Sequence, residues 1–405
     1  MDVDLVRWLT TDTGRALIAR ADALTEEGRA PLAVQTELRR DADAAHVAAA
    51  LTQSGLRRRA VAKFGDDAAQ MLFTTDALEQ ATRTTVARHR AARLEAFGTT
   101  TLVDLGCGIG GDLIAAARVG ITAAGVDLDP VRVEIARANL HALGLPGAVA
   151  VADATSVDTV PFDVAFVDPA RRTSSGRTFR TDAWTPPWPF VLELLARDAC
   201  AKVAPGIPRD LVPDGVEAEW ISEAGEVKEA ALWAGRLATT RRRATVIPAT
   251  GPGRADAAGL ATLTDEDDPG ADDVGVRPIG AFLYEPDGAV IRAGLVTAVA
   301  AGVDGALIDP QIAYVTSDAA FTTPFARGYR VVEEVPYREK QLKAALRERG
   351  IGRLTIKKRG VDVVPEQLRP RLALRGDAEA TLVLTRAAGK GTALLVEPLA
   401  VTPGG

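Results

Sequence analysis

The chain has 405 residues, 47% hydrophobic and 25% charged, a composition that supports folded cores and excludes a disordered chain. No apolar run approaches the roughly 20 residues needed to cross a bilayer. Residues 1–10, MDVDLVRWLT, lack the basic start and apolar stretch of a signal peptide. Two cysteines and three scattered histidines predict neither disulfides nor a metal site. We therefore expect a cytoplasmic protein without a metal or a membrane partner.

The charge is unevenly distributed along the chain. The net charge is −6, yet residues 325–405 carry 16 Lys and Arg against 9 Asp and Glu, a local net charge of +7. A basic end on an acidic chain predicts a polyanionic partner for that end, such as a nucleic acid. An ordinary solvated surface is the alternative explanation.

The first 97 residues show only helical patterns, with apolar residues three and four positions apart in 4–24 and 78–97. From residue 100 to 248, apolar strands alternate with helical stretches, which predicts a doubly wound parallel α/β sheet. The expected strands lie in these segments: 101–108, 122–129, 148–155, 162–169 and 200–206, with further pairing from 217–222 and 242–248. Residues 130–144 are expected to form a helix, with Pro130 in its first turn.

The remaining chain predicts a second, smaller fold. Residues 250–277 are rich in Gly, Ala and Asp, which indicates a surface insertion or a linker. From residue 329 the patterns follow the order β, α, β, α, β, β. We therefore expect a helical domain at 1–97, an α/β core at 98–284 and a basic α+β region at 285–405.

A glycine-rich loop follows the first expected strand of the core, in the segment VDLGCGIGGD at 103–112. Gly106, Gly108 and Gly111 satisfy the G-x-G-x-x-G dinucleotide pattern, whereas Gly106, Gly108 and Gly110 satisfy G-x-G-x-G. Both patterns place a nucleotide ligand against a helix N-terminus, so the loop alone does not decide between them.

Acidic residues at successive strand ends favour one kind of nucleotide. Asp127 suits the two hydroxyls of a ribose in either pattern. Asp104 lies inside the first strand, where a dinucleotide pyrophosphate gains nothing but an α-ammonium gains a counter-ion. Asp153 and Asp168 end the third and fourth strands. The set predicts a cationic adenosyl ligand, namely S-adenosylmethionine, rather than a nicotinamide dinucleotide.

These residues resemble the class I S-adenosylmethionine-dependent methyltransferases over about residues 98–248. The resemblance implies a Rossmann-like sheet and assigns roles to the residues of the motifs. Contacts to the methionine moiety fall on Asp104, Gly106, Gly108 and Gly110. Asp127 would bind the ribose and Asp153 the adenine, and Asp168 with Pro169 would form the fourth motif beside the transferred methyl.

The fourth motif departs from the pattern of enzymes that methylate exocyclic amines. Those enzymes often carry Asp or Asn, then Pro-Pro and an aromatic residue, whereas this chain has Asp168-Pro169-Ala170-Arg171. Asp168 can still accept a hydrogen bond from the N–H or O–H group that receives the methyl. The stacking ring is missing, and we expect Arg171 and Arg172 to bind a base or a phosphate instead.

Two further segments are candidates for the walls of the cleft. Trp184 and Trp188, in AWTPPWPF at 183–190, either supply aromatic surface to the substrate or pack against a neighbouring helix. Residues 225–233, GEVKEAALW, predict a charged helix beside the cleft. Arg90 and Arg93, with Arg83 and Arg88, are expected to extend a basic surface toward it.

The basic end contains a cluster at the close of an expected strand, in LTIKKRG at 354–360, where Lys357, Lys358 and Arg359 are candidates for phosphate contacts. Residues 330–398 resemble the THUMP-like domain that closes a group of bacterial S-adenosylmethionine-dependent methyltransferases. THUMP domains proper bind RNA in tRNA-modifying enzymes, so the resemblance implies an RNA partner.

The sequence as a whole predicts a methyltransferase that transfers a methyl group from S-adenosylmethionine to RNA, either tRNA or rRNA. Two alternatives stay open: a methyltransferase acting on a protein or a small molecule, and a non-catalytic RNA-binding scaffold that retains the fold. Asp104 argues against a nicotinamide-dependent oxidoreductase. Neither the methylated atom nor the oligomeric state follows from the sequence.

Overall fold

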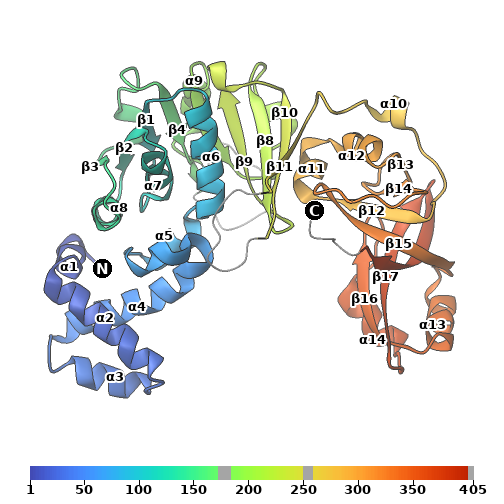
Figure 1. Ribbon diagram of the computed structural model, residues 1–405, viewed down its shortest axis with the longest axis horizontal. Helices are drawn as coiled ribbons and strands as arrows, with labels where there is room; N and C mark the ends of the chain where they lie inside the picture. Colours follow the sequence, from blue (N-terminus) through green and yellow to red (C-terminus); the bar gives the residue numbers. More distant parts are fainter. Residues whose placement is uncertain (172–183, 250–258, 400–405) are drawn as a thin grey trace. The chain divides into compact units, whose positions relative to one another are not determined.

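The computed structural model describes residues 1–171, 184–249 and 259–399, with the backbone alone for 170 and 171 (Figure 1). The described chain divides into two compact units. Unit 1 comprises Met1–Glu217 and Glu229–Thr239, and unit 2 comprises Ala218–Lys228, Thr240–Pro248 and the chain from Gly259 onward. The division into domains at 1–97, 98–284 and 285–405 stays a prediction.

Helices make up the N-terminal part of unit 1, residues 3–96, as the spacing of apolar residues predicts (Figure 1). We call this part the helical front. Side-chain caps fix several helix starts, because Asp2, Thr11, Asp43 and Thr74 each accept a hydrogen bond from a first-turn backbone N–H. The helices are α1 (Val3–Leu9), α2 (Asp12–Glu26), α3 (Pro31–Leu38), α4 (Ala44–Phe64), α5 (Thr75–Gln80) and α6 (Thr84–Ala96), with a 3₁₀ turn η1 (Gly65–Ala69) after α4.

A parallel sheet follows, with the expected alternation of strands and helices. Its strands are β1 (Thr101–Leu105), β2 (Thr122–Asp127), β3 (Ala148–Val151), β4 (Val164–Val167) and β7 (Ala199–Val203). The helices between them are α7 (Gly111–Arg118), α8 (Pro130–Ala142) and α9 (Trp188–Leu194), and short elements are η2 (Ala154–Ser156), β5 (Ala170–Arg171), β6 (Trp184–Thr185), η4 (Arg209–Leu211) and η5 (Gly235–Leu237).

The complete first sheet has the strand order β11-β10-β8-β9-β7-β4-β1-β2-β3. It includes β8 (Glu217–Glu223), β9 (Glu226–Ala234), β10 (Arg242–Ile247) and β11 (Ala261–Thr264). Parallel pairing of β1 with β2 and β4, and of β4 with β7, brings the carboxyl ends of these strands to one edge. Ligands of open α/β sheets bind at such an edge, so the topology positions the site there.

One element contradicts the sequence-based expectation. The pattern of residues 225–233 predicts a helix, but Glu226–Ala234 is the strand β9, which pairs antiparallel with β7. Ala, Glu and Leu are good helix formers, but intrinsic propensity is small beside strand pairing and burial, which override it here. The side chains from Glu229 to Ala234 are all buried, so this segment is a central strand.

Unit 2 contains a second sheet with the order β13-β14-β12-β15-β18-β17-β16. Its strands are β12 (Phe282–Pro286), β13 (Ala306–Leu307), β14 (Val315–Ser317), β15 (Ala326–Val335), β16 (Ile351–Lys358), β17 (Ala378–Ala387) and β18 (Lys390–Pro398). Its helices are α10 (Ala271–Val274), α11 (Gly288–Ala293), α12 (Val296–Gly302), α13 (Glu339–Glu348) and α14 (Pro365–Leu372). From β15 onward the order β, α, β, α, β, β matches the expectation.

A compact apolar core holds the end of unit 2 together. Leu342 and Leu346 of α13 and Leu368 and Leu372 of α14 are buried in one cluster with apolar residues of β16, β17 and β18. The spacing of four residues places each pair on one helix face. Over the ranges that the structure describes, no helix combines the length and the apolarity required of a transmembrane span.

Candidate active site

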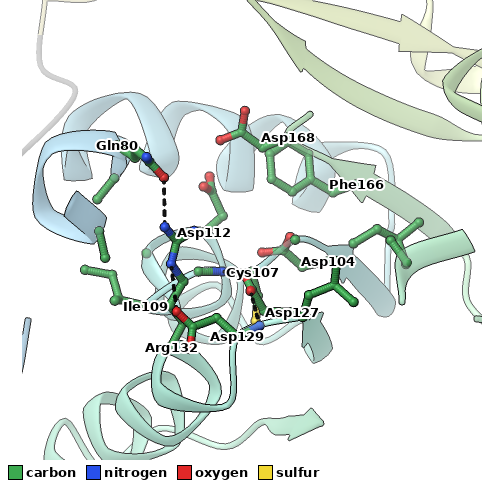
Figure 2. Close-up of a pocket in the computed structure, with 18 of the residues that line it drawn as sticks. Gln80, Asp104, Cys107, Ile109, Asp112, Asp127, Asp129, Arg132, Phe166 and Asp168 are labelled. Carbon is green, nitrogen blue, oxygen red and sulfur yellow. Dashed lines mark hydrogen bonds and ion pairs between the residues drawn. The ribbon is translucent and has the colours of Figure 1, made fainter. Parts of the chain in front are cut away.

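A pocket of about 590 Å³ lies in unit 1 at the carboxyl ends of the parallel strands. Figure 2 shows Asp104, Asp127 and Asp168 around this pocket, together with the glycine loop. Its other wall comes from the helical front, through Gln80 of α5 and Thr82. The strand-end acids predicted from the sequence therefore share one cavity.

The glycine loop has a backbone that residues with a side chain rarely adopt. Gly106 has a φ of +118° and Gly110, which precedes α7, a φ of +87°. The N–H groups of Gly106 and Cys107 both donate to the Val126 carbonyl, at 2.9 Å each. The turn is thus fixed against β2. Gly106 lines the pocket, so a ligand can approach the turn there without meeting a Cβ, whereas a Cβ on Gly110 would contact Ala136 of α8.

Asp104 is a buried carboxyl that lacks a complete set of partners. Its side chain lines the pocket and only 1% of the residue is exposed. Within the described residues, its Oδ1 atom accepts no hydrogen bond. Burial raises the pKa of Asp104 well above its usual range, and the carboxylates of Asp112, Asp168 and Asp127 act in the same direction against Arg90. A cationic group in the pocket would give Asp104 a partner and stabilise its ionised form.

Asp127 lies at the end of β2, where it organises the neighbouring backbone. Its carboxylate accepts hydrogen bonds from the N–H groups of Gly108, at 3.1 Å, and Asp129, at 2.9 Å. On the same side of the pocket, Arg132 of α8 donates to Gln80 Oε1 at 3.2 Å and lies 3.7 Å from Asp129. Figure 2 shows these residues grouped around the rim. The arrangement leaves a carboxylate edge for the hydroxyls of a ribose.

Asp153 occupies the rim beyond β3. It is exposed, lines the pocket and caps η2 by accepting the Thr155 N–H at 2.9 Å. Hydrogen bonds from the Thr155 hydroxyl and N–H lower the pKa of Asp153. It is therefore a carboxylate at neutral pH and can accept from an amine such as that of adenine.

Asp168 forms an ion pair that the sequence did not reveal. Lys202, from the neighbouring strand β7, donates to Asp168 Oδ2 at 2.5 Å and to the Thr82 hydroxyl at 3.1 Å. All three residues line the pocket. The side chain of Lys202 is 15% exposed and that of Asp168 is 35% exposed. The fourth motif thus presents a carboxylate and an ammonium side by side.

Arg90 joins this site to the sheet behind it. Its guanidinium donates to Asp112 and to Glu229, and it lies 4.5 Å from the centre of the Phe166 ring. Burial opposes the charged form, but Asp112 and Glu229 outweigh it and raise the pKa of Arg90 above its usual value.

Arg93 is enclosed in a similar way, with 10% of its side chain exposed and a 2.6 Å contact to Glu217. The prediction that Arg90 and Arg93 extend an exposed basic surface is therefore wrong. Both arginines are turned toward carboxylates of the first sheet and pack inside unit 1.

The two tryptophans are buried and do not line the pocket. Trp184 and Trp188 are buried, 5% and 7% exposed, and their rings meet edge to face with centres 5.1 Å apart. Thr185 and Pro186, between them in the chain, line the pocket, whereas neither ring is among its lining residues. Their role in substrate binding stays a prediction.

Pro169 follows Asp168 and is half-buried. The side chain of Arg171 and the whole of Arg172 lie outside the described residues.

The basic cluster of unit 2 is divided between the two faces of β16. Lys357 and Arg359 lie on the side of Glu285, with nitrogen–oxygen distances of 2.6 and 3.9 Å. Lys358 is exposed, as the alternation of side chains along a strand requires. The three residues therefore do not form one face, and Lys358 is the one directed to solvent.

Lys202, Thr82 and Asp112 are site residues that sequence reasoning did not select. A lysine inside the apolar segment CAKVAPG is a signal, since a buried lysine needs a carboxylate partner. Asp112 follows the glycine loop directly, and in the sequence it indicates only the start of a helix. Thr82 carries no recognisable signal, because α5 and α6 bring it to the pocket through tertiary packing.

The pocket residues fit S-adenosylmethionine. Asp104 offers a buried acceptor to an α-ammonium, Asp127 an edge for the ribose and Asp153 an acceptor for the adenine amine. When bound, this cosubstrate supplies a methyl group on a cationic sulfur. Asp104, Asp127 and Asp153 would hold it, and Asp168 and Lys202 line the same pocket.

Comparison with known proteins agrees with this geometry. Residues 102–171 match a methyltransferase domain family, residues 326–398 match a THUMP domain-like family, and residues 2–60 match a domain family of unknown function. An uncharacterised S-adenosylmethionine-dependent methyltransferase, found in two strains of Mycobacterium tuberculosis, is 39% identical over 343 residues. The match covers 82% of this chain and 90% of that protein.

A solved structure shares the fold over most of its length. The crystal structure of a putative methyltransferase from Porphyromonas gingivalis W83 superposes with a TM-score of 0.71 at 23% identity. The superposition covers 88% of this chain and 91% of the other. At this level of identity the comparison supports the arrangement of the chain and not a substrate.

Proposed function

We propose that this chain, which belongs to the S-adenosylmethionine-dependent methyltransferases, methylates RNA. One observation carries the choice of RNA: the chain that forms the pocket also contains a THUMP domain-like segment at residues 326–398. THUMP domains proper bind RNA in tRNA-modifying enzymes. The candidate substrates are tRNA and rRNA.

The charges of unit 2 support an RNA partner. Lys358, Arg369 and Arg375 are exposed, and within the described residues none of them has an ion-pair partner. Neighbouring cations are neutralised, since Arg353 pairs with Glu379 at 2.5 Å and Arg371 with Glu339 at 3.2 Å. Unpaired exposed cations are the groups that bind phosphates, so these three are our candidates for the RNA contact.

We assign roles to the pocket residues from their positions and their charges. Asp104 holds the α-ammonium of the cosubstrate, Asp127 the ribose and Asp153 the adenine, against the turn formed by Gly106, Gly108 and Gly110. Asp168, with Pro169, orients the acceptor. Arg171 and Arg172 follow directly in the chain and are our candidates for contacts to the RNA itself.

The test is transfer of a tritiated methyl group from S-adenosylmethionine to total RNA from cells in which the gene has been deleted. RNA from such cells has unmodified target sites, so we expect label in the RNA fraction that ribonuclease releases. Incubation of the same enzyme with RNA-free protein and with small-molecule extracts gives the comparison.

A matched variant separates transfer by this pocket from contamination. Asp127→Ala removes the carboxylate that we assign to the ribose, so this variant should transfer no label to RNA. Label in protein or in small molecules, with none in RNA, would contradict the proposal and favour the other acceptor classes.

A further inference from the structure

We infer that the methyl acceptor is a hydroxyl oxygen, the 2′-hydroxyl of a ribose in RNA, and that Lys202 together with Asp168 selects it. The inference rests on the proposed function for its choice of RNA. The choice of atom comes from the pair formed by Lys202 and Asp168.

The pair presents one donor and one acceptor to the same space. Lys202 Nζ lies 2.5 Å from Asp168 Oδ2 and 3.1 Å from Thr82 Oγ1, and both the lysine and the aspartate line the pocket. An ammonium has three N–H donors. Within the described chain, two of them are used in these contacts, which leaves one for a bound group.

Lys202 is held in its charged form by its surroundings. Burial opposes the charge, but the carboxylates of Asp168, Glu229 and Asp112 outweigh it and raise the pKa of Lys202. A charged ammonium donates hydrogen bonds and accepts none. Lys202 therefore donates a hydrogen bond to a lone pair of the methyl acceptor, and it does not remove the acceptor's proton.

This arrangement suits a hydroxyl better than an exocyclic amine. A hydroxyl has one proton and two lone pairs. It can donate the proton to Asp168, accept from Lys202 with one lone pair and attack with the other. The nitrogen of a base amine offers one lone pair at most, and an ammonium beside it would compete with the methyl carbon for that pair.

The pocket also disfavours a carboxylate as the acceptor. A carboxylate carries no proton for Asp168 to accept at neutral pH. It would also enter a space lined by the carboxyl groups of Asp104, Asp127 and Asp168.

The bond changes balance without a further reactant. A lone pair of the hydroxyl oxygen forms the C–O bond to the methyl carbon, the electron pair of the broken C–S bond stays on sulfur as a neutral thioether, and the hydroxyl proton passes to Asp168. Lys202 keeps its own protons and stabilises the negative charge that develops on the oxygen.

The closing experiment identifies the methylated atom by alkaline hydrolysis of tritium-labelled RNA. Alkali cleaves RNA through the 2′-hydroxyl, so a 2′-O-methyl group protects the adjacent linkage. We expect the label in alkali-stable dinucleotides. Label in mononucleotides would show methylation of a base and overturn this inference while the proposed function stands. Absence of label from RNA would overturn the proposed function, and the inference with it.

Variants test the part played by Lys202. Lys202→Met should lower the rate of transfer to RNA by about 10²-fold, while calorimetry shows unchanged binding of S-adenosylmethionine. Lys202→Arg keeps a charged donor and should recover part of the rate. The control is Lys228→Met, since Lys228 also pairs with a carboxylate, Glu226 at 2.6 Å, but is not among the lining residues of the pocket.

The variants also have a contradicting outcome. Equal loss of rate in Lys202→Met and in Lys228→Met would assign the effect to folding and overturn the role of Lys202. Loss of cosubstrate binding in Lys202→Met alone would show that the lysine serves the cosubstrate and not the acceptor.

Discussion

Arg90 of α6 and Glu229 of β9 form an ion pair from which water is almost excluded, with 3% and 4% of their side chains exposed. The same guanidinium pairs with Asp112, and Phe166 covers it at 4.5 Å. One arginine therefore pairs with two carboxylates, those of Glu229 and Asp112. This relationship links the helical front of unit 1 to the sheet.

Arg90→Met should destabilise the protein by about 3–5 kcal/mol, because it removes the ion-pair partner of the buried Glu229 carboxylate. Urea unfolding of the full chain, followed by tryptophan fluorescence, measures the loss. Arg59→Met is the control, since Arg59 is 56% exposed and pairs with Glu79 at 3.3 Å. An exposed pair of this kind contributes about 0–1 kcal/mol. Equal effects of the two substitutions would contradict the burial argument.

Binding of S-adenosylmethionine should release a proton from Asp104 and strengthen as pH rises. In the ligand-free protein, the Asp104 carboxyl is protonated at pH values below its raised pKa. An ammonium ligand stabilises the ionised form of this carboxyl. Calorimetric titrations between about pH 5 and pH 8, in two buffers of different ionisation enthalpy, measure the proton release. Asp104→Asn should bind weakly at every pH. An affinity that falls with pH would contradict this assignment.

The Asp104 carboxyl also makes the stability of the ligand-free protein depend on pH. Because its folded pKa is raised, the folded state binds more protons, so the ligand-free protein loses stability as pH rises above the usual pKa of an aspartate. Asp104→Asn should remove this loss and raise the thermal midpoint at neutral pH by roughly 2–4 °C per kcal/mol gained. A lower midpoint for the variant would show that Asp104 is satisfied in the ligand-free state.

The sequence predicted the site best where strand ends carry it. An apolar run followed by an acid or a glycine places Asp104, Asp127 and Asp168 at one edge of a parallel sheet, because such strands all point the same way. Lys202 and Thr82 are 120 residues apart in the chain, and only packing brings their side chains to 3.1 Å. No local pattern reports a contact of that kind.

Local composition failed in two further places. The segment 226–234 has helix-forming residues, yet β7 imposes a strand on it. Lys357 and Lys358 are adjacent and look alike in the sequence, but alternation along β16 turns one toward Glu285 and the other to solvent. Neighbours in the fold decide both cases, and composition does not describe those neighbours.

These two lysines give a test of the RNA contact. Lys358→Gln should weaken RNA retention on a filter and lower the salt slope by about 0.7–0.9 for each phosphate that the variant no longer neutralises. Lys357→Gln is the matched control, because Lys357 is engaged with Glu285 at 2.6 Å and should affect stability more than RNA binding. Equal retention by the two variants and the wild type would mean that Lys358 does not contact RNA.

Asp127→Ala should abolish binding of S-adenosylmethionine while the protein still unfolds cooperatively. The carboxylate provides the ribose edge and also holds the N–H groups of Gly108 and Asp129. Asp158→Ala is the control, because Asp158 is exposed beyond η2 and is not among the lining residues of the pocket. Unchanged affinity in Asp127→Ala would remove the ribose assignment.

The measurement that tests the central claim most directly is a calorimetric titration of the purified protein with S-adenosylmethionine and, separately, with NADH. The pocket of buried and strand-end carboxylates predicts micromolar binding of the cationic adenosyl ligand and no binding of the dinucleotide. Absence of heat with S-adenosylmethionine at several temperatures in folded protein, or equal binding of NADH, would contradict the account.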